Sequence, residues 1–72
     1  MRKPERLYDF YNELTRVHIT YFPDWRFGQL CSNFLGWIAA AKERDPFFIE
    51  EPVMLDLLHE YVEQKNMNKR RR

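Results

Sequence analysis

Four prolines divide this chain of 72 residues into three segments, each long enough for one helix. Proline fixes its own φ angle, lacks an amide hydrogen and pushes the preceding residue out of the helical region. It is therefore tolerated in the first turn of a helix or beyond its end. Pro4 and Pro52 predict helix starts, whereas Pro23 and Pro46 predict the connections between helices.

Apolar residues recur at steps of three and four in all three segments, which is the spacing of an amphipathic helix. We expect helices at about 4–21, 25–43 and 52–65. No stretch alternates with period two for long enough to form a strand. The sequence therefore predicts an all-α fold, a compact three-helix bundle over residues 1–65, with a frayed basic tail at 66–72.

The central predicted helix contains both glycines of the chain. We expect Asp24 to cap it, because the carboxylate can accept from the free amides of the first turn. Gly28, Ser32 and Gly36 share one flank, and each glycine costs about 1 kcal/mol relative to alanine. Close approach of another backbone or ring is the usual compensation, so we expect tight packing there. The inward stripe is predicted to be Phe27, Leu30, Cys31, Phe34, Ile38 and Ala41.

Size and composition argue against an enzyme. A chain of 9.0 kDa forms one small domain without room for a multilayer fold and a cofactor cleft. His18 and His59 lie on different predicted helices, and Cys31 lies on the core stripe. This pattern lacks the short ligand spacing of a zinc site and the base that a cysteine nucleophile needs. We expect no catalytic residues, no metal and no cofactor.

The single cysteine excludes an internal disulfide and is typical of a reducing compartment. The longest apolar run, Leu30 to Ala41, is too short to span a bilayer and contains polar residues. No apolar signal-peptide core follows Arg2 and Lys3. The expectation is a cytoplasmic protein that does not enter the membrane.

One face of the second helix and its first turn is almost uncharged, although it opposes much of the core stripe. Trp and Arg are over-represented in protein interfaces, so this face favours a site for a protein partner. The alternative is internal packing, in which Arg26 pairs with Asp9 or Glu13 and Trp37 belongs to the core. The residues are Trp25, Arg26, Gln29, Asn33 and Trp37.

Phe47 and Phe48 follow Asp45 and Pro46 in the second connection. Two consecutive phenylalanines in a connection cannot both easily face inward. One interpretation is that one ring caps the bundle and the other staples the third helix. The other is that they are exposed anchors for a partner or for a second copy, and a homodimer that buried them would gain stability by association.

Charge is segregated along the chain. Residues 45–64 carry six acids and no base, whereas residues 65–72 carry five bases. The basic cluster predicts, as an alternative function, a nucleic-acid accessory protein that binds phosphate without sequence preference. The competing interpretation is a solubilising tail, or one that folds back on the acidic third helix. The cations are Lys65, Lys69, Arg70, Arg71 and Arg72.

Two motifs, PDWRFGQL at 23–30 and DPFFIEE at 45–51, resemble a pattern written PDxRFGQL…DPFxxE. It is similar to that of a family of very small, uncharacterised bacterial and phage-associated proteins, over about residues 5–62. The resemblance implies a bacterial or mobile-element origin and no particular activity. Helix capping accounts for Asp24 and Pro46 in these motifs, but not for Arg26 and Gln29.

The leading prediction is therefore a small non-enzymatic protein-interaction module. It would bind its partner through the uncharged face of the second helix, assisted by Phe47 or Phe48. The alternative is nucleic-acid binding through the basic tail.

Overall fold

The computed structural model describes the backbone of residues 3–70 and the side chains of residues 3–66. It contains α1 (Glu5–Tyr21), α2 (Phe27–Ala41), a short 3-10 helix η1 (Pro46–Phe48) and α3 (Glu51–Arg70). Within the described residues there is no strand. The predicted all-α three-helix architecture is confirmed.

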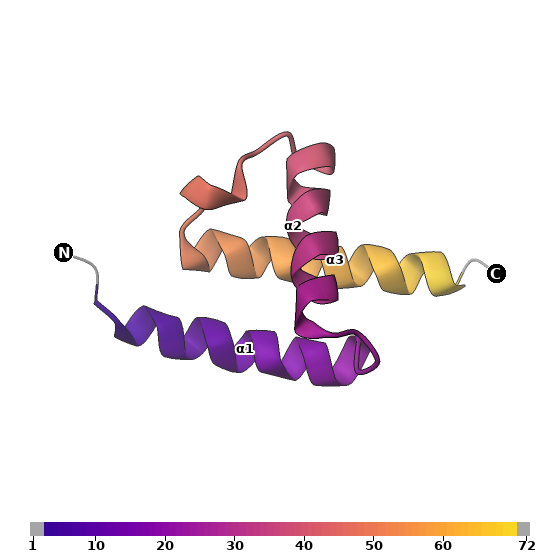
Figure 1. The fold of residues 1–72 in the computed structure, drawn as a ribbon, viewed down its shortest axis with the longest axis horizontal. Coiled ribbons are helices and arrows are strands. Elements are labelled where there is room, and N and C mark those ends of the chain that lie inside the picture. Colours follow the sequence, from indigo (N-terminus) through magenta and orange to yellow (C-terminus); the bar gives the residue numbers. More distant parts are fainter. Residues whose placement is uncertain (1–2, 71–72) are drawn as a thin grey trace.

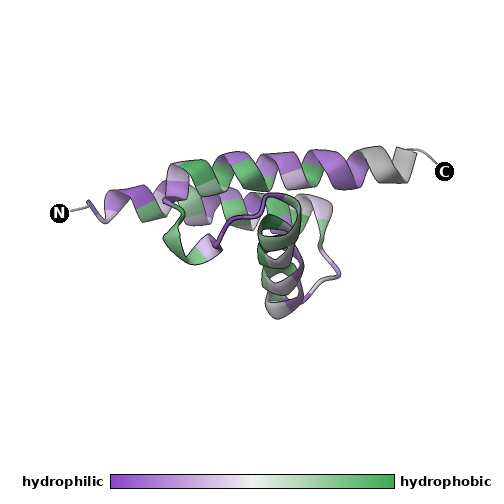
Figure 2. Cartoon of the chain, turned by 90° about the horizontal axis from the view of Figure 1, so that it is seen from above, coloured by the Kyte–Doolittle hydropathy of each residue, from purple (hydrophilic) through white to green (hydrophobic). Residues whose placement is uncertain are grey.

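The three helices form two layers (Figure 1). α1 and α3 lie side by side and run in the same direction, while α2 crosses over one face of this pair. Seen from above, α2 stands out from the pair and shows mostly apolar and neutral residues, whereas α1 and α3 alternate between hydrophilic and hydrophobic (Figure 2). One side of α2 therefore faces the core and the other side has no helix over it.

The Tyr61 ring lies at the centre of the core and is 2% exposed. Its centroid is 5.9 Å from Phe22 in the first connection, and 5.5 Å and 5.3 Å from Phe34 and Trp37 of α2. Burial raises the pKa of the Tyr61 hydroxyl. This one ring joins α3 to α2 and to the chain that leads into α2. The other buried residues are Val17, Leu30, Ile38, Leu57, Leu58 and Val62.

The start of α2 differs from the prediction. The helix begins at Phe27 rather than Trp25, and Arg26, not Asp24, is its N-cap residue. The Gln29 side chain reaches back and its Oε1 accepts a hydrogen bond from the Arg26 backbone N–H, 2.7 Å away. This contact satisfies an amide at the helix start, as in one half of a capping box. It also gives a structural reason for Gln29 in the PDWRFGQL motif.

The ends of α2 and α3 differ as well. α2 stops at Ala41, because Glu43 adopts a left-handed conformation with φ of 53° that ends the helix. α3 begins at Glu51 and continues to Arg70, so the prediction of a frayed tail from residue 66 is wrong for the backbone of 66–70. No glycine or proline follows Pro52, and the residues after it are mostly good helix formers.

Two predictions about the packing of α2 are wrong. Phe27 is 62% exposed and Ala41 is exposed, so the buried part of the stripe is Leu30, Phe34 and Ile38. A Cβ placed on Gly28 or Gly36 would meet no atom within 4 Å, so the expected close packing is absent from the described chain. The reason is the crossing of α2 over the α1–α3 pair, which covers only one side of its middle turns.

Replacement of Tyr61 tests whether this ring holds the layers together. Tyr61→Ala should lower the free energy of unfolding by about 3–5 kcal/mol, because it removes a ring that is in contact with three others. Tyr61→Phe keeps the ring and should cost much less. Urea denaturation followed by circular dichroism at 222 nm gives both values. Equal stability of the Ala and Phe variants would contradict this role.

Candidate functional site

An apolar groove of about 330 Å³ lies between α1, α2, η1 and the start of α3. We call it the aromatic groove. Of the described residues that line it, one, Glu51, is charged. The lining consists of Phe10, Tyr11, Leu14, Phe27, Leu30, Cys31, Phe34, Leu35, Pro46, Phe47, Ile49, Glu51 and Met54.

The floor of the aromatic groove belongs to the core and its rim is exposed. Leu30 and Phe34 are 1% and 4% exposed, whereas Phe27 and Phe47 are 62% and 84% exposed. The rim is held by local structure, because the Asp45 carboxylate accepts a hydrogen bond from the Phe47 backbone N–H at 3.0 Å and so fixes the start of η1. The groove thus presents large apolar rings to solvent on a defined backbone.

Phe48 is also exposed, at 75%, and its ring meets the Phe47 ring edge to face with centroids 4.9 Å apart. These exposures contradict the interpretation in which one ring caps the bundle and the other staples the third helix. The two rings stand at the surface, where the exposed-anchor interpretation placed them.

The side of α2 that faces away from the core adjoins this groove, and we call it the outer face of α2. No charged residue occurs from Phe27 to Ala41. A helix face in contact with water usually carries lysine and glutamate, and exposed residues of α1 and α3 do include charges. The outer face of α2 consists of the exposed residues Gly28, Gln29, Ser32, Gly36, Ala39 and Ala40.

The predicted interface residues separate into two groups. Arg26, Gln29 and Asn33 are exposed. The Arg26 side chain forms no ion pair with any described residue, so the expected alternative, a pairing with Asp9 or Glu13, is not formed.

The two tryptophans belong to the internal packing. Trp37 is half-buried against Tyr61, and its Nε1–H donates to Gln64 Oε1 at 3.1 Å. Trp25 is half-buried and stacks on Phe22 with ring centroids 4.4 Å apart. For Trp37, this is the alternative of internal packing, in which the residue belongs to the core. Trp25 and Trp37 thus hold α2 in place, and the rim residues Phe27 and Tyr11 were not predicted as site residues from the sequence.

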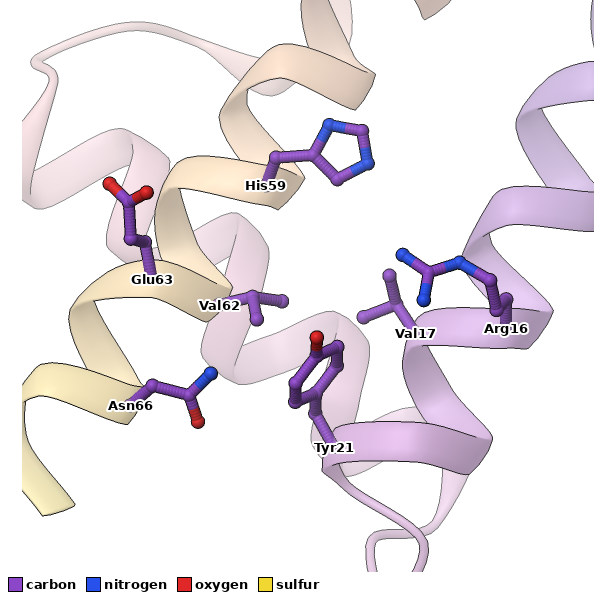
Figure 3. Close-up of a pocket in the computed structure, with 7 residues that line it drawn as sticks. All are labelled: Arg16, Val17, Tyr21, His59, Val62, Glu63 and Asn66. Atoms are coloured by element: carbon purple, nitrogen blue, oxygen red, sulfur yellow. The ribbon is translucent and has the colours of Figure 1, made fainter.

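A second hollow, of about 260 Å³, lies between α1 and α3 (Figure 3). It is lined by Arg16, Val17, Tyr21, His59, Val62, Glu63 and Asn66.

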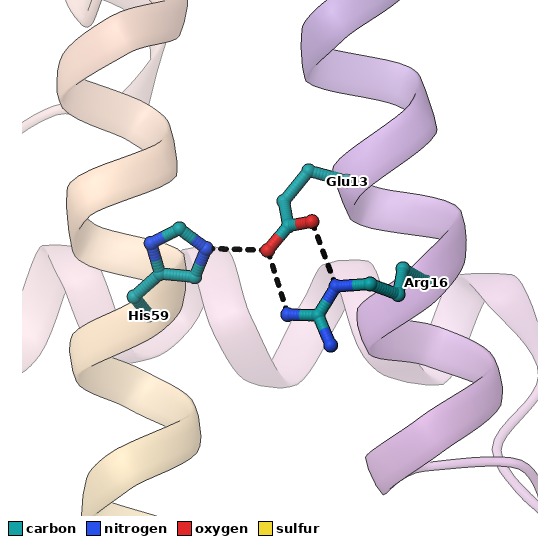
Figure 4. A network of polar contacts seen from close by, with 3 residues as sticks. All are labelled: Glu13, Arg16 and His59. Atoms are coloured by element: carbon teal, nitrogen blue, oxygen red, sulfur yellow. Dashed lines mark hydrogen bonds and ion pairs between the residues drawn. The ribbon is translucent and has the colours of Figure 1, made fainter.

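The polar residues beside this hollow clamp the two helices together (Figure 4). Glu13 accepts two hydrogen bonds of 2.8 Å from the Arg16 guanidinium, and its Oε2 is 2.6 Å from His59 Nε2 on α3. The hydrogen bonds from Arg16, and then from His59, lower the pKa of Glu13 to about 2. We call these three residues the Glu13 clamp.

Two further side chains of reactive types are His18 and Cys31. His18 Nε2 donates to the Trp25 carbonyl at 2.7 Å. Burial raises the pKa of the Cys31 thiol, which disfavours the reactive thiolate. Among the described residues, no group of three or more His, Cys, Asp or Glu side chains could hold a metal ion.

The basic cluster is described only at its first member. Lys65 is exposed, and its Nζ lies 5.5 Å from the Tyr61 ring centroid. The side chains of Lys69, Arg70, Arg71 and Arg72 lie outside the described residues.

Comparisons with known proteins do not assign this chain to a family. Neither the protein-family models, nor the curated proteins, nor the solved structures contain a match to this chain. The resemblance of the two motifs therefore stays a prediction. Over the part of the chain that the structure describes, no helix is long and apolar enough to cross a bilayer.

The Glu13 clamp predicts a specific pH dependence of stability. The folded-state pKa of Glu13 lies below its ordinary value of 4.5, so the carboxylate stabilises the fold above pH 4.5, and this contribution is lost as the pH falls toward 2. Glu13→Gln should lower stability at pH 7 by less than about 1 kcal/mol, since the clamp is partly exposed, and should flatten the acid dependence.

Urea denaturation at several pH values between 2 and 7 measures this effect. Asp9→Asn is the matched control, because Asp9 is an exposed acid of the same helix and the substitution makes the same change in charge. An acid dependence in Glu13→Gln equal to that of Asp9→Asn would show that the clamp does not stabilise the fold.

Proposed function

We propose that this protein is a small, non-enzymatic protein-interaction module that binds through the aromatic groove and the adjoining outer face of α2. The observation that carries this proposal is the exposure of Phe27, Phe47 and Phe48, at 62%, 84% and 75%, beside a helix without charge. Contiguous exposed apolar surface in a small domain is typical of an interaction site.

The groove suits an apolar side chain of a partner. Such a side chain would contact the buried floor of Leu30 and Phe34 and be enclosed by the rings of the rim. The core holds the floor, and the Asp45 hydrogen bond fixes the backbone at the start of η1, so the backbone around the groove is ordered before binding. Arg26 at the N-cap and Asn33 in the middle of α2 are both exposed and would supply directional hydrogen bonds.

Several observations support a function without catalysis. His59 belongs to the Glu13 clamp, and His18 donates to the Trp25 carbonyl in the first connection. Burial raises the pKa of the Cys31 thiol. Residues that enzymes use as bases and nucleophiles are therefore engaged in holding the fold or are disfavoured in their reactive form.

The proposal includes a cytoplasmic location and a bacterial or mobile-element origin. The lone Cys31 is typical of a reducing compartment, and the motifs at 23–30 and 45–51 resemble bacterial and phage-associated sequences.

A capture experiment tests the proposal. The tagged chain is incubated with nuclease-treated bacterial lysate, and the proteins retained by wild type and variants are compared quantitatively. Phe27→Glu and Arg26→Glu should each reduce capture of a specific partner by at least tenfold, because both side chains are exposed at the proposed interface and free of ion pairs in the fold. Ile19→Glu, an equally exposed apolar position on α1, is the matched control.

Two results would contradict the proposal. One is equal capture by Phe27→Glu and Ile19→Glu. The other is capture that occurs only from untreated lysate and disappears both after nuclease treatment and after substitution of glutamine at all five basic positions, 65 and 69–72. That result would support nucleic-acid binding by the tail instead. Circular dichroism of each variant shows whether the helices are retained.

A further inference from the structure

Five large rings are exposed next to one another around the aromatic groove. Phe27, Phe47 and Tyr11 line the groove, and Tyr11 also lines a neighbouring hollow of about 360 Å³ together with Tyr8. The Phe48 ring contacts the Phe47 ring. Each of the five rings is between 56% and 84% exposed. We call them the exposed ring surface, and contiguous apolar surface of this kind marks an interaction site.

The exposed ring surface is large enough to form the centre of a stable dimer interface. An aromatic side chain has about 200 Å² of surface to bury, so the five rings together expose about 700 Å². One partner contributes about 800 Å² to an interface of standard size, and the centre of such an interface is rich in aromatic residues. Pro46 and Ile49 line the same groove, are partly exposed and extend this area.

Phe48 is the one ring of this surface that lines neither the groove nor the neighbouring hollow. It is 75% exposed, and it belongs to η1, whose first turn is held by the hydrogen bond from the Phe47 backbone N–H to the Asp45 carboxylate. Its edge-to-face contact with Phe47 adds a second local constraint. A large exposed ring on an ordered backbone is typical of an interface anchor.

The aromatic groove suits an uncharged ring of this size. Its volume of about 330 Å³ accommodates one phenylalanine side chain, and Leu30 and Phe34 form an apolar floor. The one charged residue in the described lining, Glu51, is already paired, with its Oε1 2.9 Å from Arg6 Nε. The lining therefore offers no unpaired charge to a charged ligand, whereas a ring would lie among other rings.

The anchor and the groove lie next to each other in the same chain, because Phe48 contacts Phe47 and Phe47 lines the groove. The interface of a two-fold dimer uses the same surface of both copies. When the two-fold axis passes midway between an anchor and a hole, the anchor of each copy enters the hole of the other. One dimer would thus fill both grooves and cover both anchors.

We propose that the occupant of the aromatic groove is Phe48 of the partner subunit, in a two-fold dimer whose interface is the exposed ring surface. This inference rests on the proposed function and names the partner for the groove. The outer face of α2 is not part of this interface and remains available to another protein.

Sedimentation equilibrium of the full chain, from about 1 to 200 µM, measures the association. The wild type should form a dimer, and Phe48→Glu should weaken it at least tenfold, because a carboxylate would have to enter an apolar groove. Ile19→Glu makes the same change in charge at an exposed apolar position outside both hollows and should leave the dimer unchanged. A monomeric wild type, or equal weakening by both variants with their circular dichroism retained, would overturn the proposal.

A mixture of two variants tests the reciprocal insertion. Phe48→Ala removes the anchor and keeps the groove, whereas Phe27→Glu places a charge on the rim of the groove and keeps the anchor. Each variant alone loses both insertions, but a mixed dimer keeps one. Native mass spectrometry of an equimolar mixture should therefore show that more than half of all dimers are mixed. A mixed share of half or less, as random pairing gives, would overturn the insertion of Phe48.

The failure of the dimer can be told apart from the failure of the proposed function. If the wild type is monomeric up to 200 µM but Phe27→Glu loses capture of another protein while Ile19→Glu does not, the interaction module stands with a different occupant. If the wild type is monomeric and Phe27→Glu captures as wild type does, both the dimer and the proposed function fail.

Discussion

The contact between the Tyr61 ring and the rings of Phe22, Phe34 and Trp37 decides how this small chain is arranged. It places α2 across the α1–α3 pair instead of along it, and it ties the first connection to the same point. Among the residues that the structure describes, only Leu30, Ile38, Leu58 and Val17 are buried as completely as Tyr61. Because α2 crosses the pair, one side of it has no neighbour among the described residues. The outer face of α2 and the aromatic groove both follow from that geometry.

The ion pairs between helices lie mostly away from the aromatic groove and the outer face of α2. The Glu13 clamp joins α1 to α3, Arg6 Nε lies 2.9 Å from Glu51 Oε1, and Lys42 pairs with Glu60. These partly exposed pairs contribute modestly to stability but fix which surfaces meet within the chain. The aromatic groove and the outer face of α2 contain almost no charge, so contacts there depend on shape and on removal of apolar surface from water. This division between charged and uncharged surface is the physical basis for the proposed interaction site.

The helices were predictable because their signals are local. Proline positions and apolar spacing gave three helices, and the middle of the predicted stripe, Leu30, Phe34 and Ile38, is buried. Periodicity shows which side of a helix is apolar, but not how much of that side a neighbouring helix covers. For this reason the sequence predicted Phe27 in the core, whereas the crossing of α2 leaves its ring exposed. The Gln29 cap was missed because Asp24 offered a stronger cap signal. The aromatic groove depends on contacts between distant segments, and only its exposed phenylalanines at 47 and 48 could be suspected from the sequence.

The most direct test of the central claim is the broadening of ¹H–¹⁵N correlation signals of the wild-type chain by a soluble nitroxide. If α2 crosses the pair with one side uncovered, the signals of Gly28, Ser32 and Gly36 should broaden strongly, while those of Leu30 and Ile38 are protected. Equal protection of the two groups would contradict the account.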